Sequence, residues 1–312
     1  MSKSALLSSS IAKKYWMAAT GLFLCLFLVG HLLGNLQLLI PGEEGKLAFN
    51  QYAYFMTTNI FVKVLSYVTY ISIIFHAVDG FLLTIQNKKA RPVQYAYNHP
   101  SANSSTPARY MAILGTLILI FIATHMQNFW WKMKYSSTPM PIHTEKFFQP
   151  ERQVDGKVAD VEKKVYRTTS NQLLPVEEVE IRNGNEVYAS LEEVRKSISQ
   201  MDPSYKPKGD NPLLGHVYKD LHSVVLSFFG HNKTEEAGIT ANPMALYAVL
   251  FYAISMIVLG FHLWHGFASA FQSLGLNHKR YNGLIKSAGH GFAVIVPLLF
   301  AIIPIILYMN RI

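Results

Sequence analysis

Five runs of predominantly apolar residues divide this sequence, and each is long enough to cross a bilayer as a helix. They cover residues 15–40, 61–85, 110–131, 244–271 and 288–309. A hydrocarbon core about 30 Å thick requires roughly 20 helical residues, which is more than the core helices of a globular protein usually offer in one run. We therefore predict an all-α integral membrane protein with five transmembrane helices, called helices I to V below.

The segment between helices III and IV differs from the rest of the chain. Residues 132–242 hold fifteen Lys or Arg and sixteen Asp or Glu. The middle part, VDGKVADVEKKVYR through LEEVRKSISQMDPSYKPKGDNP, favours short strands or helices with turn-rich ends. The stretch DLHSVVLSFFG at 220–230 has an apolar face at helical spacing, which suits a helix on the outer membrane surface and equally a helix packed within the segment.

These features divide the chain into three parts. Residues 1–131 carry helices I–III, residues 132–242 form a large insert, and residues 243–312 carry helices IV and V. Long loops cross a membrane largely regardless of their charge, so the mixed charge of the insert is compatible with an extracytoplasmic position.

The basic residues outside the insert predict the orientation of the helices. The formal net charge is +9, and the loops before helix I, between II and III and between IV and V contain no acidic residue. Their basic residues are Lys3, Lys13, Lys14, Lys88, Lys89, Arg91, Arg109, Lys279, Arg280 and Lys286. The positive-inside rule places these loops in the cytoplasm, and the insert and carboxy terminus outside it. Because the charge follows the spans, it does not indicate nucleic-acid binding.

Five histidines lie well inside the apolar runs, and a sixth, His290, lies at the cytoplasmic start of the last run. The five are His31, His76, His125, His262 and His265. Ionisable side chains are costly in hydrocarbon and usually functional, although a single intramembrane histidine is more often a hydrogen-bonded packing residue or a relay element than a metal ligand. Their relative depths therefore decide how they are interpreted.

Two of these histidines share a layer far from the cytoplasmic boundary. His31 is 17 residues past Lys14, and His125 is 16 residues past Arg109. At about 1.5 Å per residue, both lie about 24 to 26 Å deep on helices that run the same way. Two such histidines can face each other across a planar macrocycle and bind both axial positions of its iron.

A second pair shares a layer nearer the cytoplasm. His76 and His262 each precede a polar boundary, Gln86 and Gln272, by 10 residues, which places both about 15 Å deep. Two pairs in two layers predict two haems. The single cysteine, Cys25, cannot form a CxxCH attachment or ligate an iron–sulfur cluster, so we expect non-covalent haem b.

A short repeat supports the second pair. The segments FHAVDGF at 75–81 and FHLWHGF at 261–267 share a histidine followed four residues later by a glycine, Gly80 or Gly266. A glycine one turn from a ligand leaves room for a flat ring on the same helix face. His265 competes with His262 as the ligand, and we favour His262 because it shares the glycine spacing of His76.

Several motifs together resemble a known family. The opening SSSIAKKYWMAATGLFLCLFLVGHLLGNLQL and the segments FHAVDG and GFHLWHGF are similar to helices I, II and IV of the cytochrome b membrane anchor of succinate:quinone oxidoreductases, in its five-helix, single-chain, di-haem form. The resemblance implies that His31 and His125 bind a distal haem, and that His76 and His262 bind a proximal haem.

The resemblance also implies a function. A cytoplasmic iron–sulfur subunit and a flavoprotein subunit would perform the succinate and fumarate chemistry, and this chain would exchange electrons with a membrane quinone, expected to be menaquinone. The quinone would bind near the outer ends of helices I and III. Polar residues there are Gln37, Glu43, Glu44, Asn50 and Gln127, each of which is otherwise an ordinary interfacial residue.

Three other functions fit parts of the pattern. The cytochrome b anchor of a hydrogenase or formate dehydrogenase also holds bis-histidine haems between helices. A haem-free transporter or proton channel would use the histidines as a relay. A purely structural anchor would use the insert as its interaction module.

Overall fold

The computed structural model describes residues 9–93, 97, 99, 102, 104–135, 139–152, 158–190 and 212–309. Within these residues, five helices are long and apolar enough to cross a membrane. They are built on α2 (Ser10–Leu36), α4 (Ile60–Lys89), α7 (Met111–Met126), α11 (Ala245–Ser273) and α12 (Lys279–Met309). The 3-10 turn η1 (Gln37–Leu39) extends α2, and the π-helical turn η2 (Gln127–Trp131) and α8 (Lys132–Tyr135) extend α7. The five predicted spans are confirmed as helices of sufficient length and hydropathy.

Polar residues determine where two of these helices begin. The Ser9 hydroxyl accepts a hydrogen bond from the Ala12 N–H at the start of α2, and the Asn59 side chain accepts hydrogen bonds from the first turn of α4. Such caps satisfy backbone donors that the first helical turn leaves unpaired. Helix α12 begins at Lys279, before the predicted residue 288, because its polar first turns continue the helix beyond the apolar run.

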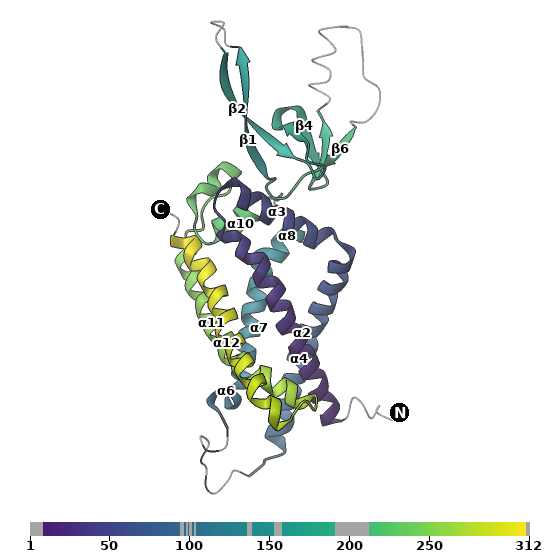
Figure 1. The fold of residues 1–312 in the computed structure, drawn as a ribbon, viewed down its shortest axis with the longest axis vertical. Coiled ribbons are helices and arrows are strands. Elements are labelled where there is room, and N and C mark those ends of the chain that lie inside the picture. Colours follow the sequence, from purple (N-terminus) through teal and green to yellow (C-terminus); the bar gives the residue numbers. More distant parts are fainter. Residues whose placement is uncertain are drawn as a thin grey trace.

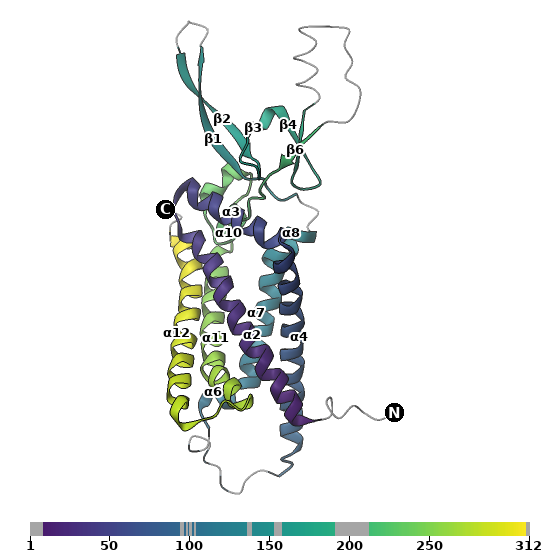
Figure 2. The same ribbon diagram turned by 45° about the vertical axis from the view of Figure 1, so that its right-hand side comes forward.

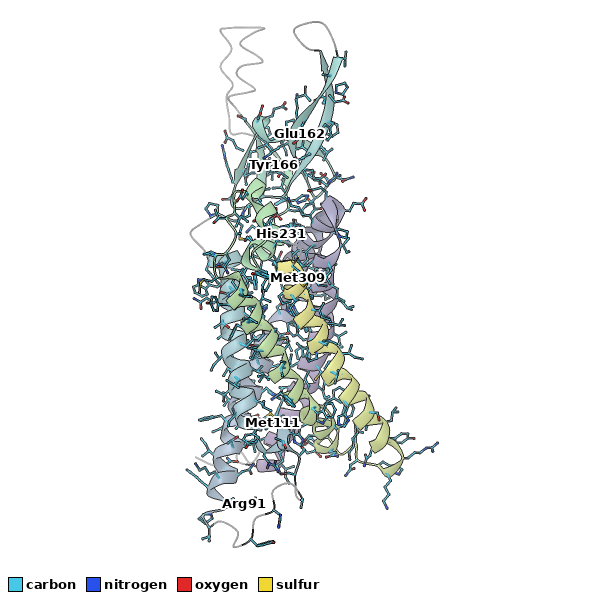
Figure 3. The ribbon with its side chains drawn as sticks, turned by 90° about the vertical axis from the view of Figure 1, so that its left-hand side faces the viewer. Arg91, Met111, Glu162, Tyr166, His231 and Met309 are labelled. Carbon is cyan, nitrogen blue, oxygen red and sulfur yellow. The ribbon has the colours of Figure 1, made fainter. Side chains whose placement is uncertain are left out.

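The five long helices form an elongated antiparallel bundle (Figures 1 and 2). Helices α2, α7 and α12 run toward one end, and α4 and α11 return, so the two termini lie at opposite ends of the bundle. Figure 3 shows the same division, with Arg91 and Met111 at one end and His231 and Met309 at the other. The end that carries Met309 is called the capped end below, because further helices and two sheets cover it.

Two short helices cover the capped end. Helix α3 (Gly42–Thr58) joins α2 to α4, and α10 (Leu221–Phe228) packs against it. The predicted helix within 220–230 is therefore confirmed. Phe49 of α3 and Val225 of α10 are buried in one apolar cluster with Leu32, Tyr252 and residues of α12. This burial supports packing of α10 within the protein rather than along a lipid surface.

Two small antiparallel sheets lie beyond these helices (Figure 2). One has the order β1-β2-β3 and the other β4-β5-β6. Their strands are β1 (Thr144–Arg152), β2 (Val158–Arg167), β3 (Leu173–Pro175), β4 (Val179–Arg182), β5 (Glu186–Ala189) and β6 (Leu213–His216).

The prediction of an all-α fold is wrong for this region, whereas the short strands expected as one alternative for its middle part are confirmed at β2. In β2, exposed and partly buried residues alternate along VADVEKKVYR, which is the period of a strand with one face packed. Asn183 and Gly184 adopt positive φ between β4 and β5, as a tight hairpin turn requires. Residues 191–211, for which short strands or helices were also expected, lie outside the described residues.

Candidate functional site

The structure brings His76 and His262 together in the half of the bundle away from the capped end. His76 lies on α4 and His262 on α11, and their ring centroids are 6.1 Å apart with the ring planes at 68°. His265, on the same helix as His262, has no ring contact with His76 among the described contacts. His262 is therefore the histidine of this helix that faces His76, and its role as a ligand stays a prediction.

The structure also brings His31 and His125 together, nearer the capped end. His31 lies on α2 and His125 on α7, with ring centroids 5.8 Å apart and ring planes at 85°. Aromatic side chains surround this couple. Phe27 stacks on His31, Phe121 stacks on His125, and Tyr252 approaches His125 from α11.

Both separations suit one metal ion between two imidazoles. A metal–imidazole bond is about 2 Å long, and the ring centroid lies about 1 Å beyond the bonded nitrogen, so a shared metal places the two centroids about 6 Å apart. The two couples have centroid separations of 5.8 and 6.1 Å. Imidazole pairs are common axial ligands of haem iron.

Two nitrogens of the couples lack a hydrogen-bond partner in the part of the chain that the structure describes. They are Nδ1 of His125 and Nδ1 of His262, and Nδ1 of His222 and Nε1 of Trp130, outside the couples, share this property. A histidine that binds iron through Nε2 leaves Nδ1 free, so these atoms are compatible with Nε2 ligation but do not by themselves indicate it. The ring separations are what make the residues present fit a bis-histidine haem in each layer.

Glycines allow close approach between helices beside the His76–His262 couple, which is called the inner couple below. A Cβ atom added to Gly21 would lie 3.1 Å from Cε1 of His76, and one added to Gly115 would lie 3.8 Å from Cε1 of His262. Gly21 and Gly115 are on the helices that pack against each histidine's own helix. A methyl group at Gly21 would be too close for ordinary contact and would push the His76 ring, whereas one at Gly115 would be at van der Waals distance from His262.

The glycines predicted to seat the haem have different neighbours. A Cβ atom added to Gly80 would lie 3.3 Å from the methyl carbon of Met17, and one added to Gly266 would lie 3.3 Å from that of Met111. Methionine methyl groups therefore lie beside Gly80 and Gly266, and the expectation that these glycines face a flat ring stays a prediction. Sequence reasoning missed Gly21 and Gly115, although each follows a methionine by four residues on helices I and III.

Of the residues proposed for the quinone site, Asn50 is already occupied by protein contacts. It is 1% exposed. Its Oδ1 accepts a hydrogen bond from the backbone N–H of His222, its Nδ2 donates to Asp220 Oδ1, and Nδ2 lies 3.2 Å from Nδ1 of His143. Both polar atoms of the Asn50 amide are therefore engaged by the protein. Asn50 is for this reason a poor candidate for binding a quinone.

The other quinone-site candidates stay predictions. Gln37 begins η1, Glu43 and Glu44 form the first turn of α3, and Gln127 begins η2. All four lie at the capped end, where the His31–His125 couple is the nearer of the two. The π-helical turn that starts at Gln127 alters the helical repeat immediately after His125, and such turns are frequent at functional sites.

A buried polar cluster joins the sheets to the bundle at the capped end. Lys46 Nζ lies 3.3 Å from Asp220, and Ser223 donates hydrogen bonds to the same carboxylate. Burial by itself raises the pKa of Asp220, but Lys46 and the hydrogen bonds from Ser223 and Asn50 outweigh burial and lower it. The Asp220 carboxylate is therefore charged and fully paired.

The same cluster continues into the first sheet. His143 Nδ1 faces the amide donor of Asn50, so this nitrogen accepts and the proton lies on Nε2, which faces Glu145 at 3.3 Å. Arg167 of β2 binds both carboxylate oxygens of Glu145 at 2.6 Å and lowers the pKa of Glu145. Burial lowers the pKa of His143. The cluster is thus a continuous contact from α3 and α10 to β1 and β2.

Comparisons with protein-family models, with curated proteins and with solved structures find no match for this chain. Functional assignment therefore depends on the geometry of the two histidine couples and on the motifs of the sequence.

Proposed function

We propose that this chain is a di-haem cytochrome b membrane anchor of the succinate:quinone oxidoreductase type. The observation that supports it best is the arrangement of four intramembrane histidines into two couples, His31 with His125 and His76 with His262, with ring centroids 5.8 and 6.1 Å apart. The motif resemblance of helices I, II and IV supports the same function.

In this proposal each couple holds one haem b by its two imidazoles. Bound haem supplies one-electron redox chemistry. The chain would contribute the four imidazoles that hold the two groups, in two layers along the bundle, and would keep these imidazoles away from water. The apolar residues of the five helices contact membrane lipid and exclude solvent around the couples.

The proposal includes an orientation and partners. The basic loops at the end carrying Arg91 would face the bacterial cytoplasm and contact the iron–sulfur subunit, which in turn binds the flavoprotein subunit. The capped end and residues 132–242 would lie outside the cytoplasm. A quinone, expected to be menaquinone, would react near the His31–His125 couple. Dicarboxylate chemistry would belong to the partner subunits.

Purification of the chain with its native partners tests this function. We expect a reduced-minus-oxidised spectrum with a b-type band, co-purifying iron–sulfur and flavoprotein subunits, and reduction of a menaquinone analogue by succinate. Co-purifying hydrogenase or formate dehydrogenase subunits would identify the anchor of another quinone-linked enzyme. A spectrum without a b-type band from the intact complex would contradict the proposal and favour a transporter or channel.

A further inference from the structure

The residue spacing and the contacts of α2 and α4 are repeated in α7 and α11. Met17, Gly21 and His31 of α2 have the same spacing as Met111, Gly115 and His125 of α7. The contacts repeat as well, because Gly21 faces His76 as Gly115 faces His262, and Met17 faces Gly80 as Met111 faces Gly266. Each histidine couple therefore joins one helix of the first half to the equivalent helix of the second.

The repeat breaks at the residue that precedes Gly21 on α2 and Gly115 on α7. Thr20 precedes Gly21, whereas Leu114 precedes Gly115. Thr20 is buried, and its Oγ1 lies 3.3 Å from Nδ1 of His76. The equivalent nitrogen, Nδ1 of His262, is buried without a partner among the described residues. In the inner couple, Nδ1 of His76 therefore has a hydrogen-bond partner, and Nδ1 of His262 has none among the described residues.

The direction of the Thr20 hydrogen bond follows from its other contact. Oγ1 lies 2.7 Å from the Trp16 carbonyl, to which it donates its only proton. Towards His76 the hydroxyl can only accept, so the His76 proton lies on Nδ1 and the lone pair lies on Nε2. The Met17 carbonyl on the same turn is a second acceptor near this ring. This is the tautomer that binds a metal through Nε2.

We propose that Thr20 is a positioning residue that fixes His76 as an Nε2 ligand and makes the two ligands of the inner haem inequivalent. This inference rests on the proposed function, since it presupposes haem at the His76–His262 couple. A hydrogen bond from the outer nitrogen of a ligating histidine raises the basicity of the ligand. The more basic His76 favours ferric iron, so Thr20 lowers the midpoint potential of the inner haem.

Three variants separate this role from simple packing. Thr20→Val keeps the shape of the side chain and removes the hydroxyl, so that of the two acceptors named above only the Met17 carbonyl is left beside His76. Thr20→Ser keeps the hydroxyl and removes a methyl group. Leu114→Thr places a hydroxyl at the equivalent position beside His262, where it can donate to its own helix and accept from Nδ1 of His262, as Thr20 does for His76.

Redox titration and low-spin EPR of the complex with its native partners test the proposal. We expect Thr20→Val to raise the midpoint potential of one haem, to shift its EPR signal and to speed its transfer to apomyoglobin by about tenfold. Thr20→Ser should leave the midpoint potential, the EPR signal and the rate of haem transfer close to those of the unmodified protein. Leu114→Thr should lower the midpoint potential of the same haem. An unchanged potential and EPR spectrum in Thr20→Val at full haem content would overturn the proposal, as would equal losses of haem in Thr20→Val and Thr20→Ser. Absence of haem from the unmodified complex would instead refute the proposed function.

Discussion

His76 and His262 face each other with ring centroids 6.1 Å apart, although they come from different halves of an internal repeat. His31 and His125 do the same in the layer nearer the capped end. A ligand held by either couple would therefore connect the α2–α4 half of the bundle to the α7–α11 half. Such a ligand would add contacts to α7, none of whose residues is fully buried by the protein.

Substitution of Gly21 by alanine tests the close approach of α2 to His76. The new methyl group would lie 3.1 Å from the imidazole, so the ring must move, at a cost of about 1 kcal/mol or more. We expect Gly21→Ala to lower the thermal stability of haem binding at the inner couple, measured as loss of the b-type absorbance on heating. Gly30→Ala on the same helix is the control, since nothing lies within 4 Å of the added atom. Equal effects of the two substitutions would contradict the role of Gly21.

Substitution of Asn50 tests the polar cluster at the capped end. Asn50→Leu leaves Asp220 and His143 each without one hydrogen-bond donor in a buried site, which should cost about 2 to 4 kcal/mol. We expect faster proteolysis within residues 139–230 in the folded, detergent-solubilised protein. Gln51→Leu changes a neighbouring exposed residue and should have almost no effect. If the two variants were cleaved at the same rate, the cluster would not hold the sheets to the bundle.

The same cluster should weaken in mild acid. Burial lowers the pKa of His222 from 6.5 to about 4. Between these two pH values, the unfolded region binds a proton that the folded region does not, so the folded region loses up to roughly 3 kcal/mol as pH falls. The lowered pKa of Asp220 acts in another window, because its contribution is lost only as pH falls below its unfolded pKa of 3.8.

Hydrogen exchange of the amides in 212–230 measures this effect. After correction for the intrinsic pH dependence of exchange, protection should be lower at pH 5 than at pH 7. His222→Phe should reduce the difference, while His143, whose pKa burial also lowers, continues to contribute. Identical protection at both pH values in the unmodified chain would show that these histidines do not oppose protonation in the folded state.

The parts of the fold that were predicted from sequence depend on short-range patterns. Apolar runs of sufficient length give the five helices, and the rise per residue places His31 beside His125 and His76 beside His262. Helical depth is a local property, so two residues at one depth on helices that run the same way are natural partners.

The parts that were missed depend on contacts between distant segments. Short strands were expected in this segment only as an alternative to helices, because short strands with mixed charge have weak sequence signals, and their pairing into two sheets was not predicted. Gly21 lies beside His76, and Gly80 does not, because α2 packs against α4, which is a contact between distant segments. The burial of Asn50 depends on Asp220 and His143, which lie in the segment between helices III and IV.

Haem stoichiometry tests the central claim most directly. We expect the purified chain to contain about two haems by the pyridine haemochrome assay, and His31→Ala and His76→Ala to contain about one each, because loss of one axial ligand should release its own haem and spare the other layer. His265→Ala should retain both haems. A His76→Ala variant that keeps both haems, or a His265→Ala variant that loses one, would contradict the pairing of His76 with His262.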